Sequence, residues 1–250
     1  MPVTPVPALK DNYVWMFPTG PDRQAAVDPG AAAPVLRVLE RTGAGLSHIL
    51  ITHHHHDHIG GVAELVRRTG ARVVGAAADS DRLPPLASAV ADGQILTLGT
   101  VTGRVLTVPG HTMGHVAYLV GDALFCGDTL FSAGCGRLFE GSPEQMWTSL
   151  TRLRALPDAT RVCCAHEYTL TNLEFVGTLW PDDPDLQALF AAAAARADRD
   201  VPTLPTLLGQ EKRHNPFLRC DDPALAKRLG QAGQSPTMVF AHLRELRNRH

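Results

Sequence analysis

The chain has 250 residues, of which 44% are apolar and 19% charged, with a formal net charge of −2. This composition is ordinary for a globular protein with a sizeable core, and so small a charge gives no field that would attract nucleic acid or an anionic membrane. No apolar run approaches the ~20 residues of a membrane-spanning helix. Five cysteines without a Cys-x-x-Cys pair, and no signal-peptide pattern, predict a cytoplasmic protein. We expect a monomer.

The first two thirds of the chain alternate short strands with helices. Apolar or alternating runs bounded by turn residues predict strands over residues 3–9, 12–18, 24–27, 46–51, 72–77, 94–98, 104–108, 116–120, 123–126 and 161–165. Helical spacing of apolar residues predicts helices over residues 35–42 and 61–69, each followed by a glycine. A capping box that begins at Ser142 and includes Pro143 starts a third helix.

The pattern changes after residue 168, where we find no convincing strand. An alanine-rich segment around residues 185–198 predicts a helix, and Asp222-Pro223 and Ser235-Pro236 are typical helix starts. The chain therefore divides into a mixed α/β part, residues 1–168, and an all-helical part, residues 169–250. The helical part is either a small domain docked on the first or only a packing cap, and its length favours a domain.

A dense group of metal-binding side chains follows the strand over residues 46–51: His53, His55, Asp57 and His58. Imidazole and carboxylate bind zinc, iron and manganese. Four ligands within six residues are too many for one tetrahedral ion that keeps an open position, so two adjacent ions are the natural interpretation. The alternative is an exposed histidine-rich tract, which would not interleave an aspartate. His54 and His56 alternate with the ligands and are expected to pack or to support them.

Three further candidate ligands, His111, Asp128 and His166, each follow a predicted strand. Alone, each signal is weak, but together they complete five histidines and two aspartates, which suits two ions. We expect His53, His55 and His111 on one ion, Asp57, His58 and His166 on the other, and Asp128 as the bridge. His115 is expected to be a supporting residue. Asp28, in an Asp-Pro-Gly turn, is interpreted as structural only.

The pattern His-x-His-x-Asp-His, followed by Pro-Gly-His-Thr, Cys-Gly-Asp-Thr and a final histidine, resembles the metallo-β-lactamase fold superfamily. This resemblance implies an α/β fold, the αβ/βα sandwich, over residues 1–168, with a dinuclear site at one edge. It does not fix the reaction, because the superfamily includes hydrolases, nucleases and oxidoreductases.

Further segments are similar to hydroxyacylglutathione hydrolases, the glyoxalase II family. They are Leu9-Lys10-Asp11-Asn12-Tyr13, residues 133–141, His166-Glu167-Tyr168-Thr169, Asn215-Pro216-Phe217-Leu218-Arg219 and the helical C-terminal part. The resemblance implies hydrolysis of S-D-lactoylglutathione, a 2-hydroxyacylglutathione thioester, to glutathione and D-lactate, the second step of methylglyoxal detoxification. It implies two divalent metal ions, with zinc favoured over iron or manganese.

The same resemblance implies a glutathione-binding set: Arg137, Phe139, Tyr168, Arg244 and Arg247. Phe139 stands where the family has a tyrosine, and the alternative is that its ring points into the core. Asp57 and Asp128 are the expected catalytic carboxylates, which position the attacking water. A thiolate with a free pKa of ~8.5 leaves without a general acid, which suits a thioester. The alternative function is a glutathione persulfide dioxygenase-like enzyme with one iron.

Overall fold

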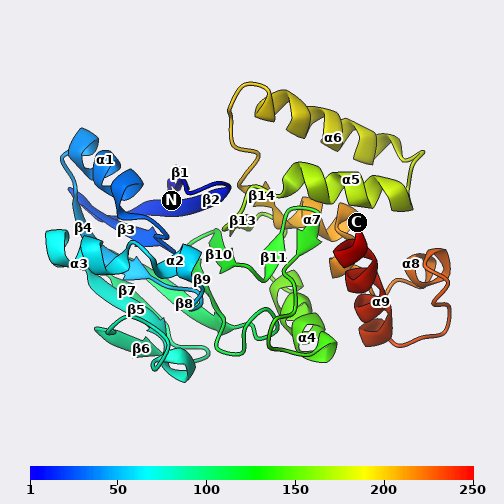
Figure 1. Cartoon of the computed structure of the whole chain (residues 1–250), viewed down its shortest axis with the longest axis horizontal. Helices are drawn as coiled ribbons and strands as arrows, with labels where there is room; N and C mark the ends of the chain where they lie inside the picture. Colours follow the sequence, from blue (N-terminus) through cyan, green and yellow to red (C-terminus); the bar gives the residue numbers. More distant parts are fainter.

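The computed structural model describes residues 1–250 and confirms an α/β sandwich of two six-stranded sheets with helices outside (Figure 1). The first sheet contains, in spatial order, β1 (Thr4–Ala8), β2 (Asn12–Gly20), β3 (Arg23–Val27), β4 (Gly45–Leu50), β5 (Arg72–Ala76) and β6 (Ser88–Val90). The second contains β14 (Thr206–Leu207), β13 (Arg161–Cys164), β10 (Ala123–Gly127), β9 (Val116–Val120), β8 (Val101–Thr107) and β7 (Ile95–Leu98). A separate hairpin pairs β11 (Leu130–Phe131) with β12 (Gly134–Cys135).

Helices cover the outer faces of both sheets. They are α1 (Ala32–Thr42), α2 (His56–Ile59), α3 (Val62–Thr69), α4 (Pro143–Arg154), α5 (Thr169–Leu179), α6 (Pro184–Ala197), α7 (Leu208–His214), α8 (Pro223–Arg228) and α9 (Pro236–Arg249), with short 3-10 helices at Ala77–Asp79 and Pro216–Leu218. α1 and α3 lie against the first sheet, and α4 packs against α9. No helix combines the length and the apolar character needed to span a membrane.

β2 is largely buried because both faces of its sheet are covered. Successive side chains of a strand point to opposite faces, so Trp15 and Phe17 enter the core between the sheets, while Val14 and Met16 enter the core under α1 and α3. The two sheets contact each other directly: the ring of Phe17 stacks on Phe125 of β10 at 5.2 Å.

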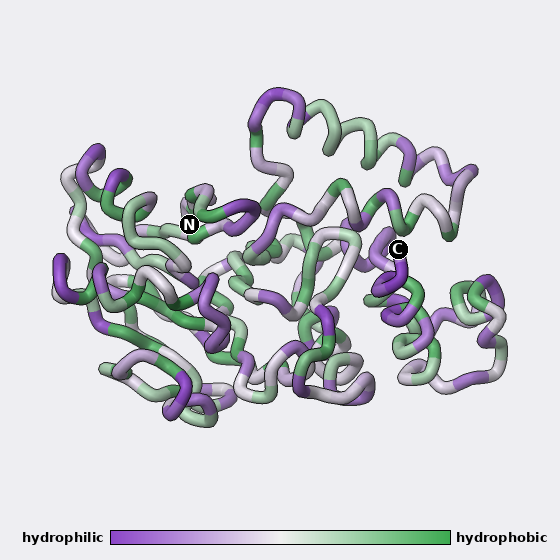
Figure 2. The backbone as a smooth tube through the Cα atoms, in the orientation of Figure 1, coloured by the Kyte–Doolittle hydropathy of each residue, from purple (hydrophilic) through white to green (hydrophobic).

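The larger hydrophobic core continues into the C-terminal part of the chain. It includes Phe125 between the sheets and Phe217, Phe240 and Leu243 of the helical part. In Figure 2, green segments run through the interior strands, while the start of the loop between α6 and β14 and the end of α9 are purple. The predicted domain boundary at residue 168 stays a prediction, but the two parts share one core.

Most predicted elements are present, with corrections where the strands are very short. β6, β11 and β12 were not predicted, and the expectation of no strand after residue 168 is wrong, because β14 pairs with Arg161 and Val162 of β13. Strands of two or three residues carry too little alternation to be recognised. The predicted caps are confirmed at Ser142, Asp222 and Ser235.

The topology brings the candidate ligands to one edge of the sandwich. β3 and β4 run parallel in the first sheet, and β10 and β13 run parallel in the second. Neighbouring parallel strands end at the same edge, which is where open α/β sheets present their functional loops. The loops that follow β4, β10 and β13 therefore deliver His53, Asp128 and His166 to a common place.

The loop after β4 packs backbone to backbone on the turn after β3. Gly61 donates its N–H to the carbonyl of Pro29 at 2.9 Å, and a Cβ at Gly61 would lie 2.5 Å from the carbonyl carbon of Ala31. The Gly60-Gly61 pair at the end of the histidine motif is thus a requirement of packing.

We expect Gly61→Ala to destabilise the fold by about 1–3 kcal/mol, because backbone atoms must move to admit the methyl group. Gly177→Ala is the matched control: Gly177 lies in α5 with open space around it, so alanine should stabilise the protein by roughly 0.5–1 kcal/mol. Thermal unfolding of both variants measures the difference. A Gly61→Ala protein as stable as the parent would contradict this account.

Candidate metal centre

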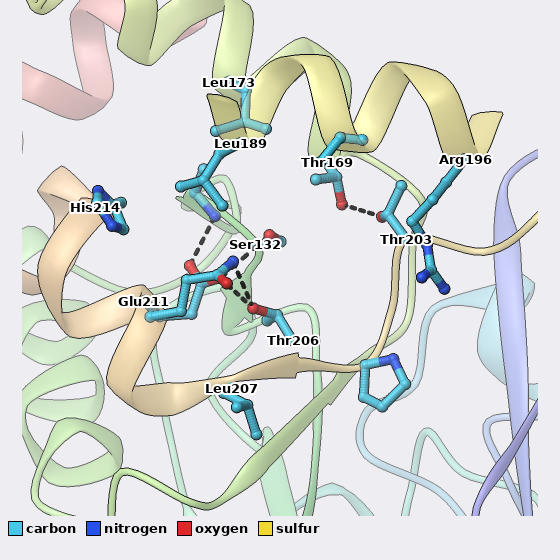
Figure 3. Close-up of a pocket in the computed structure, with 15 residues that line it drawn as sticks. Ser132, Thr169, Leu173, Leu189, Arg196, Thr203, Thr206, Leu207, Glu211 and His214 are labelled. Carbon is cyan, nitrogen blue, oxygen red and sulfur yellow. Dashed lines mark hydrogen bonds between the residues drawn. The ribbon is translucent and has the colours of Figure 1, made fainter. Parts of the chain in front are cut away.

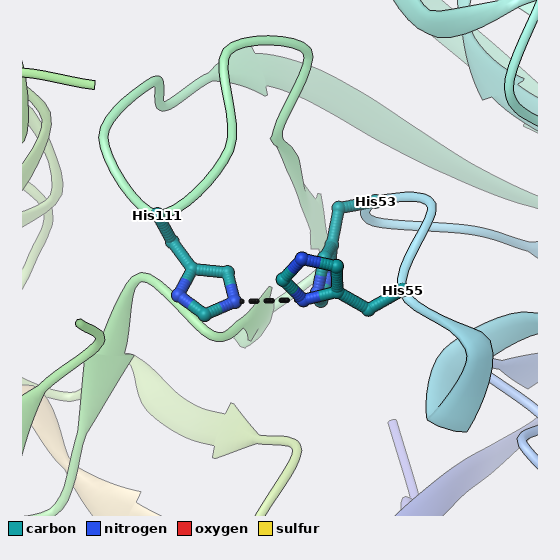
Figure 4. A group of neighbouring side chains, drawn as sticks. All are labelled: His53, His55 and His111. Atoms are coloured by element: carbon teal, nitrogen blue, oxygen red, sulfur yellow. Dashed lines mark hydrogen bonds between the residues drawn. The ribbon is translucent and has the colours of Figure 1, made fainter. Parts of the chain in front are cut away.

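Three histidines from two loops bring their ring nitrogens together (Figure 4). Nδ1 of His55 lies 3.0 Å from Nε2 of His53 and 3.1 Å from Nε2 of His111. His53 and His55 come from the loop after β4, and His111 comes from the loop between β8 and β9. Since the three nitrogens lie within 4.8 Å of one another, a single ion between them could bind all three.

Asp57, His58 and His166 form a second group beside the first. Asp57 and His58 lie on the single turn of α2, and His166 follows β13. Oδ2 of Asp57 lies 3.4 Å from Nε2 of both histidines. The division of the predicted ligands into two sets is therefore present in the geometry.

Asp128 lies between the two groups. Its Oδ1 is 3.5 Å from Nε2 of His58 and 3.4 Å from Nε2 of His166, while its Oδ2 is 3.5 Å from Nε2 of His111. One carboxylate oxygen thus faces each group, which is the arrangement that a bridging ligand requires.

The donor atoms fit a divalent metal site. Both ring nitrogens of His58 and Oδ1 of Asp128 are buried and make no hydrogen bond, although buried polar atoms normally have a partner. Nδ1 of His58 is 3.1 Å from Oδ2 of Asp28, but the contact lacks hydrogen-bond geometry and is electrostatic. Cations bound by the inward-facing atoms would satisfy Nε2 of His58 and Oδ1 of Asp128.

The pKa values of the buried histidines also favour a metal site. Burial, together with the neighbouring His58 and His115, holds the pKa of His53 well below its usual value, so His53 is neutral, the form that binds a metal. For His58, burial also lowers the pKa, but the carboxylates of Asp128 and Asp28 outweigh it and raise the pKa. The buried carboxylates therefore favour positive charge at the centre of the cluster.

Outer hydrogen bonds orient the ligand rings. Nδ1 of His111 donates to the carbonyl of Arg137 at 2.8 Å, and Nδ1 of His166 donates to Oδ1 of Asp11 at 2.8 Å. A donor bond from one ring nitrogen leaves the other free to bind a metal. Asn12 similarly donates to Oδ2 of Asp57 at 2.9 Å.

Asp28 does more than form a turn, so our sequence interpretation of it was incomplete. Its buried carboxylate accepts hydrogen bonds from the backbone N–H and the hydroxyl of Thr52, both at 2.7 Å, and it also faces His58. The Thr52 hydroxyl is left to accept from Nδ1 of His53 at 3.0 Å. The sequence carried one usable signal: Asp28 directly follows β3, the parallel neighbour of the strand that precedes the motif.

The remaining histidines lie outside the two groups. His115 is buried, its ring stacks on His53 with centroids 4.6 Å apart, and its Nε2 accepts the backbone N–H of Asp128 at 3.2 Å. His54 contacts Asp79 at 3.1 Å. His115 therefore supports the cluster as expected, whereas His54 pairs with Asp79 outside it and His56 is exposed.

A cavity of about 720 Å³ opens beside Asp128, within the usual range for ligand sites of roughly 300–1,000 Å³. All five residues of the predicted glutathione-binding set line it. The complete lining is Lys10, Asp11, Asp128, Phe131, Cys135, Arg137, Phe139, Glu167, Tyr168, Thr171, Asn172, Glu174, Arg244, Arg247 and His250. The structure thus joins residues from both parts of the chain in one site.

Three arginines give the cavity a cationic wall. Arg137 is exposed, and Arg247 donates to Oδ1 of Asn172 at 3.2 and 3.3 Å. Burial lowers the pKa of Arg247, and the charges of Arg244 and Arg137 lower it further. Since none of the three pairs with a carboxylate of the chain, an anionic ligand would relieve their mutual repulsion.

Arg244 also makes contacts that stabilise the fold. It is buried, its Nη1 donates to the carbonyl of Cys135 at 2.8 Å, and its guanidinium lies 5.2 Å above the ring of Phe217. Its charge reaches the cavity, but its removal would also leave a buried carbonyl without a donor.

Two aromatic residues flank the metal-binding groups. Phe139 is 64% exposed, with its ring edge-on to His55 and His111 at 5.5 and 5.2 Å, so the alternative that it points into the core is wrong. The ring of Tyr168 stacks on His166 at 4.8 Å. Burial and the charge of Asp11 raise the pKa of Tyr168 to about 12, so its hydroxyl stays a donor.

Comparisons with known proteins agree with this geometry. Residues 18–166 match the metallo-beta-lactamase superfamily, and residues 167–250 match the hydroxyacylglutathione hydrolase C-terminus. The hydroxyacylglutathione hydrolase of Methylococcus capsulatus is 50% identical over 242 residues, which covers 96% of this chain and 94% of that protein. The chain belongs to the hydroxyacylglutathione hydrolase family.

Solved structures with the same fold place this family member within the wider superfamily. ETHE1 from Myxococcus xanthus is 27% identical with a TM-score of 0.70, and the match covers 98% of this chain and 90% of that one. TTHA1623 in a di-iron-bound form is 28% identical with a TM-score of 0.64, and the match covers 86% of this chain and all of that one.

Proposed function

We propose that this hydroxyacylglutathione hydrolase cleaves S-D-lactoylglutathione to glutathione and D-lactate, the second step of methylglyoxal detoxification. The observation that carries the proposal is a cavity with three arginines in its lining that opens beside Asp128, a member of the cluster of metal ligands. Identity of 50% over nearly the whole chain to a protein of that name supports thioester hydrolysis over the dioxygenase alternative.

Two divalent ions, zinc by preference, are proposed at the cluster. His53, His55 and His111 would hold one, Asp57, His58 and His166 the other, with Asp128 between them. Bound there, the metals would polarise the thioester carbonyl and lower the pKa of a bound water. The di-iron form of the similar structure TTHA1623 supports a count of two.

The carboxylates of Asp57 and Asp128 are proposed as the catalytic groups, which orient the attacking water. Asp128 lies between the two groups of ligands, Asp57 faces His58 and His166, and Asn12 donates a hydrogen bond to Asp57. Water adds its oxygen to the thioester carbon, the carbon–sulfur bond breaks, and the proton ends on the departing thiolate. With a free pKa of ~8.5, that thiolate leaves without a general acid.

The glutathione part is proposed to lie in the 720 Å³ cavity, with its carboxylates toward Arg137, Arg244 and Arg247. Arginine suits this task because its planar guanidinium can bind a carboxylate through two parallel hydrogen bonds. Tyr168 would donate its hydroxyl, and Phe139 would offer only its ring. The helical part, residues 169–250, would then act as the substrate-binding domain.

The setting of the enzyme is proposed to be the cytoplasm. All five cysteines are buried and unpaired, which is usual where the compartment keeps thiols reduced. The expected monomeric state stays a prediction.

We expect the protein to release thiol from S-D-lactoylglutathione when oxygen is absent, since hydrolysis consumes only water. Thiol detection in an anaerobic chamber measures the reaction, and Asp57→Asn at the site should reduce it severely. Thiol release that depends on oxygen uptake would contradict the hydrolase and favour the one-iron dioxygenase alternative.

The two sets of ligands predict close to two metal ions per chain. Elemental analysis of protein purified without chelator is the measurement, repeated after zinc, iron or manganese is supplied. His166→Ala should reduce the count by about one, because it removes a ligand from one set only. A count that stays at one in the parent protein would refute the dinuclear site.

We expect Arg247→Ala to raise KM about tenfold or more with little change in kcat, because a charge-assisted contact remote from the thioester is lost. Arg244→Ala should in addition lower the melting temperature, since the carbonyl of Cys135 loses its donor. Arg249→Ala is the matched control, because Arg249 is exposed and pairs only with Glu245. Equal KM values for the Arg247 and Arg249 variants would show that Arg247 does not bind substrate.

A further inference from the structure

The β11–β12 hairpin, residues 130–135, joins the metal cluster to the substrate cavity. Asp128 stands just before it and Arg137 just after it, and its strands are only two residues long. Its turn residue Ala133 has a φ of +54°, which is unfavourable for a residue with a side chain. So short a two-stranded unit is at best marginally stable alone, so other parts of the chain must hold it.

Two residues hold the hairpin: Glu211 of α7, which Figure 3 shows beside Ser132 and Thr206, and Asn215, which directly follows α7. The buried carboxylate of Glu211 accepts the backbone N–H of Ala133 at 2.8 Å and the hydroxyl of Ser132 at 3.1 Å. It also accepts from Thr206 at 2.9 Å, which ties it to β14.

Asn215 holds the hairpin together with Glu211, and we call these two residues the clamp. Its amide nitrogen donates to the carbonyls of Phe131 and Gly134, at 3.1 and 3.0 Å, and to Oε2 of Glu211 at 3.1 Å. These carbonyls stand at both ends of the hairpin turn. Asn215 opens the Asn-Pro-Phe-Leu-Arg segment singled out in the sequence, to which the proposed reaction gives no role.

A shift of the hairpin would displace groups that orient the metal ligands. The carbonyl of Arg137 orients His111, so the segment that follows β12 sets the direction of a metal ligand. The backbone is also tightly packed there, because a Cβ at Gly136 would lie 1.9 Å from the carbonyl oxygen of Asp128. The two ends of the hairpin cannot move independently.

We infer that Glu211 and Asn215 are positioning residues, which hold the β11–β12 hairpin in the one geometry that presents Asp128 and His111 to the metal cluster and Arg137 to the cavity. Neither touches the substrate cavity, so they act only through the hairpin. The inference rests on the proposed function for its kinetic consequences, but not for its structural ones.

The main test compares Glu211→Ala with Glu211→Gln. Glutamine keeps an amide oxygen that can accept from the N–H of Ala133 and the amide of Asn215. Its NH₂ group can donate to the hydroxyls of Ser132 and Thr206, because a hydroxyl can accept a hydrogen bond as well as donate one. Asp183→Ala, which removes the cap of α6, controls for a general loss of stability. All variants are measured at a temperature at which circular dichroism shows them to be folded.

Hydrogen exchange of the peptide that covers residues 129–139 is the readout that needs neither substrate nor activity. Glu211→Ala should speed its exchange roughly tenfold or more, because a bond to a charged group is lost, while peptides from β9 stay unchanged. Glu211→Gln and Asp183→Ala should stay near the parent. Unchanged exchange in folded Glu211→Ala would overturn the clamp.

Kinetics then separate positioning from stability. Glu211→Ala should lower kcat about tenfold or more, as removal of groups that orient metal ligands commonly does, with Glu211→Gln largely restoring it. The Asp183→Ala protein should keep the kcat of the parent even if its melting temperature falls as far as that of Glu211→Ala. If Glu211→Ala loses no more activity than Asp183→Ala, the two residues only stabilise the fold.

A milder pair of variants decides the question if Glu211→Ala does not fold. Ser132→Ala and Thr206→Val each remove one hydroxyl donor to the same carboxylate oxygen, but only Ser132 belongs to the hairpin. The inference requires faster exchange of residues 129–139 and a lower kcat in Ser132→Ala alone. Equal effects of the two would refute it.

The outcomes also separate this inference from the proposed function. A parent protein that does not hydrolyse S-D-lactoylglutathione would sink the proposed function, while the exchange of residues 129–139 would still test the clamp. If the parent hydrolyses S-D-lactoylglutathione but hydrogen exchange of residues 129–139 is unchanged in Glu211→Ala, only the inference about the clamp is refuted.

Discussion

The structure depends on the attraction between buried carboxylates and a positive charge at the centre of the ligand cluster. Asp57, Asp128 and Asp28 all face His58, whose ring nitrogens make no hydrogen bond. Without cations, such a cluster would have to hold protons on its imidazoles to offset its carboxylates, at a cost in desolvation. With divalent cations, the same carboxylates become ligands. The surrounding fold serves to bring these groups close together.

The parallel strand pairs achieve this approach. β3 with β4, and β10 with β13, end at the same edge, so four loops converge on one place. The loops can approach closely because glycines stand at the contact points, as Gly61 does against the turn after β3. The helical part then closes the other side of the cavity and contributes Arg244 and Arg247. The metal ligands thus come from the first part of the chain, while both parts line the cavity and share one hydrophobic core.

Much of this could be predicted from the sequence, because the strongest signals were local. A histidine motif between an apolar strand and an apolar helix face places its ligands on a loop, and the grouping of the seven ligands follows from where the other strands end. The supporting residues were harder to find. Asp28 and Asp11 act across long separations, and nothing in a turn pattern shows which carboxylate will meet which imidazole. β14 and the β11–β12 hairpin were missed because tertiary partners, and not alternation, define strands of two residues.

The hairpin has a consequence for how this chain could have been assembled over time. Side chains beyond residue 168 donate hydrogen bonds to four backbone carbonyls of the hairpin, those of Phe131, Ser132, Gly134 and Cys135. A side chain beyond residue 168 also accepts the backbone N–H of Ala133. A shorter ancestor without the helical part would have needed a different segment here. The hairpin and the helical part therefore depend on each other structurally, and grafting only one of them onto a relative would leave buried polar groups without partners.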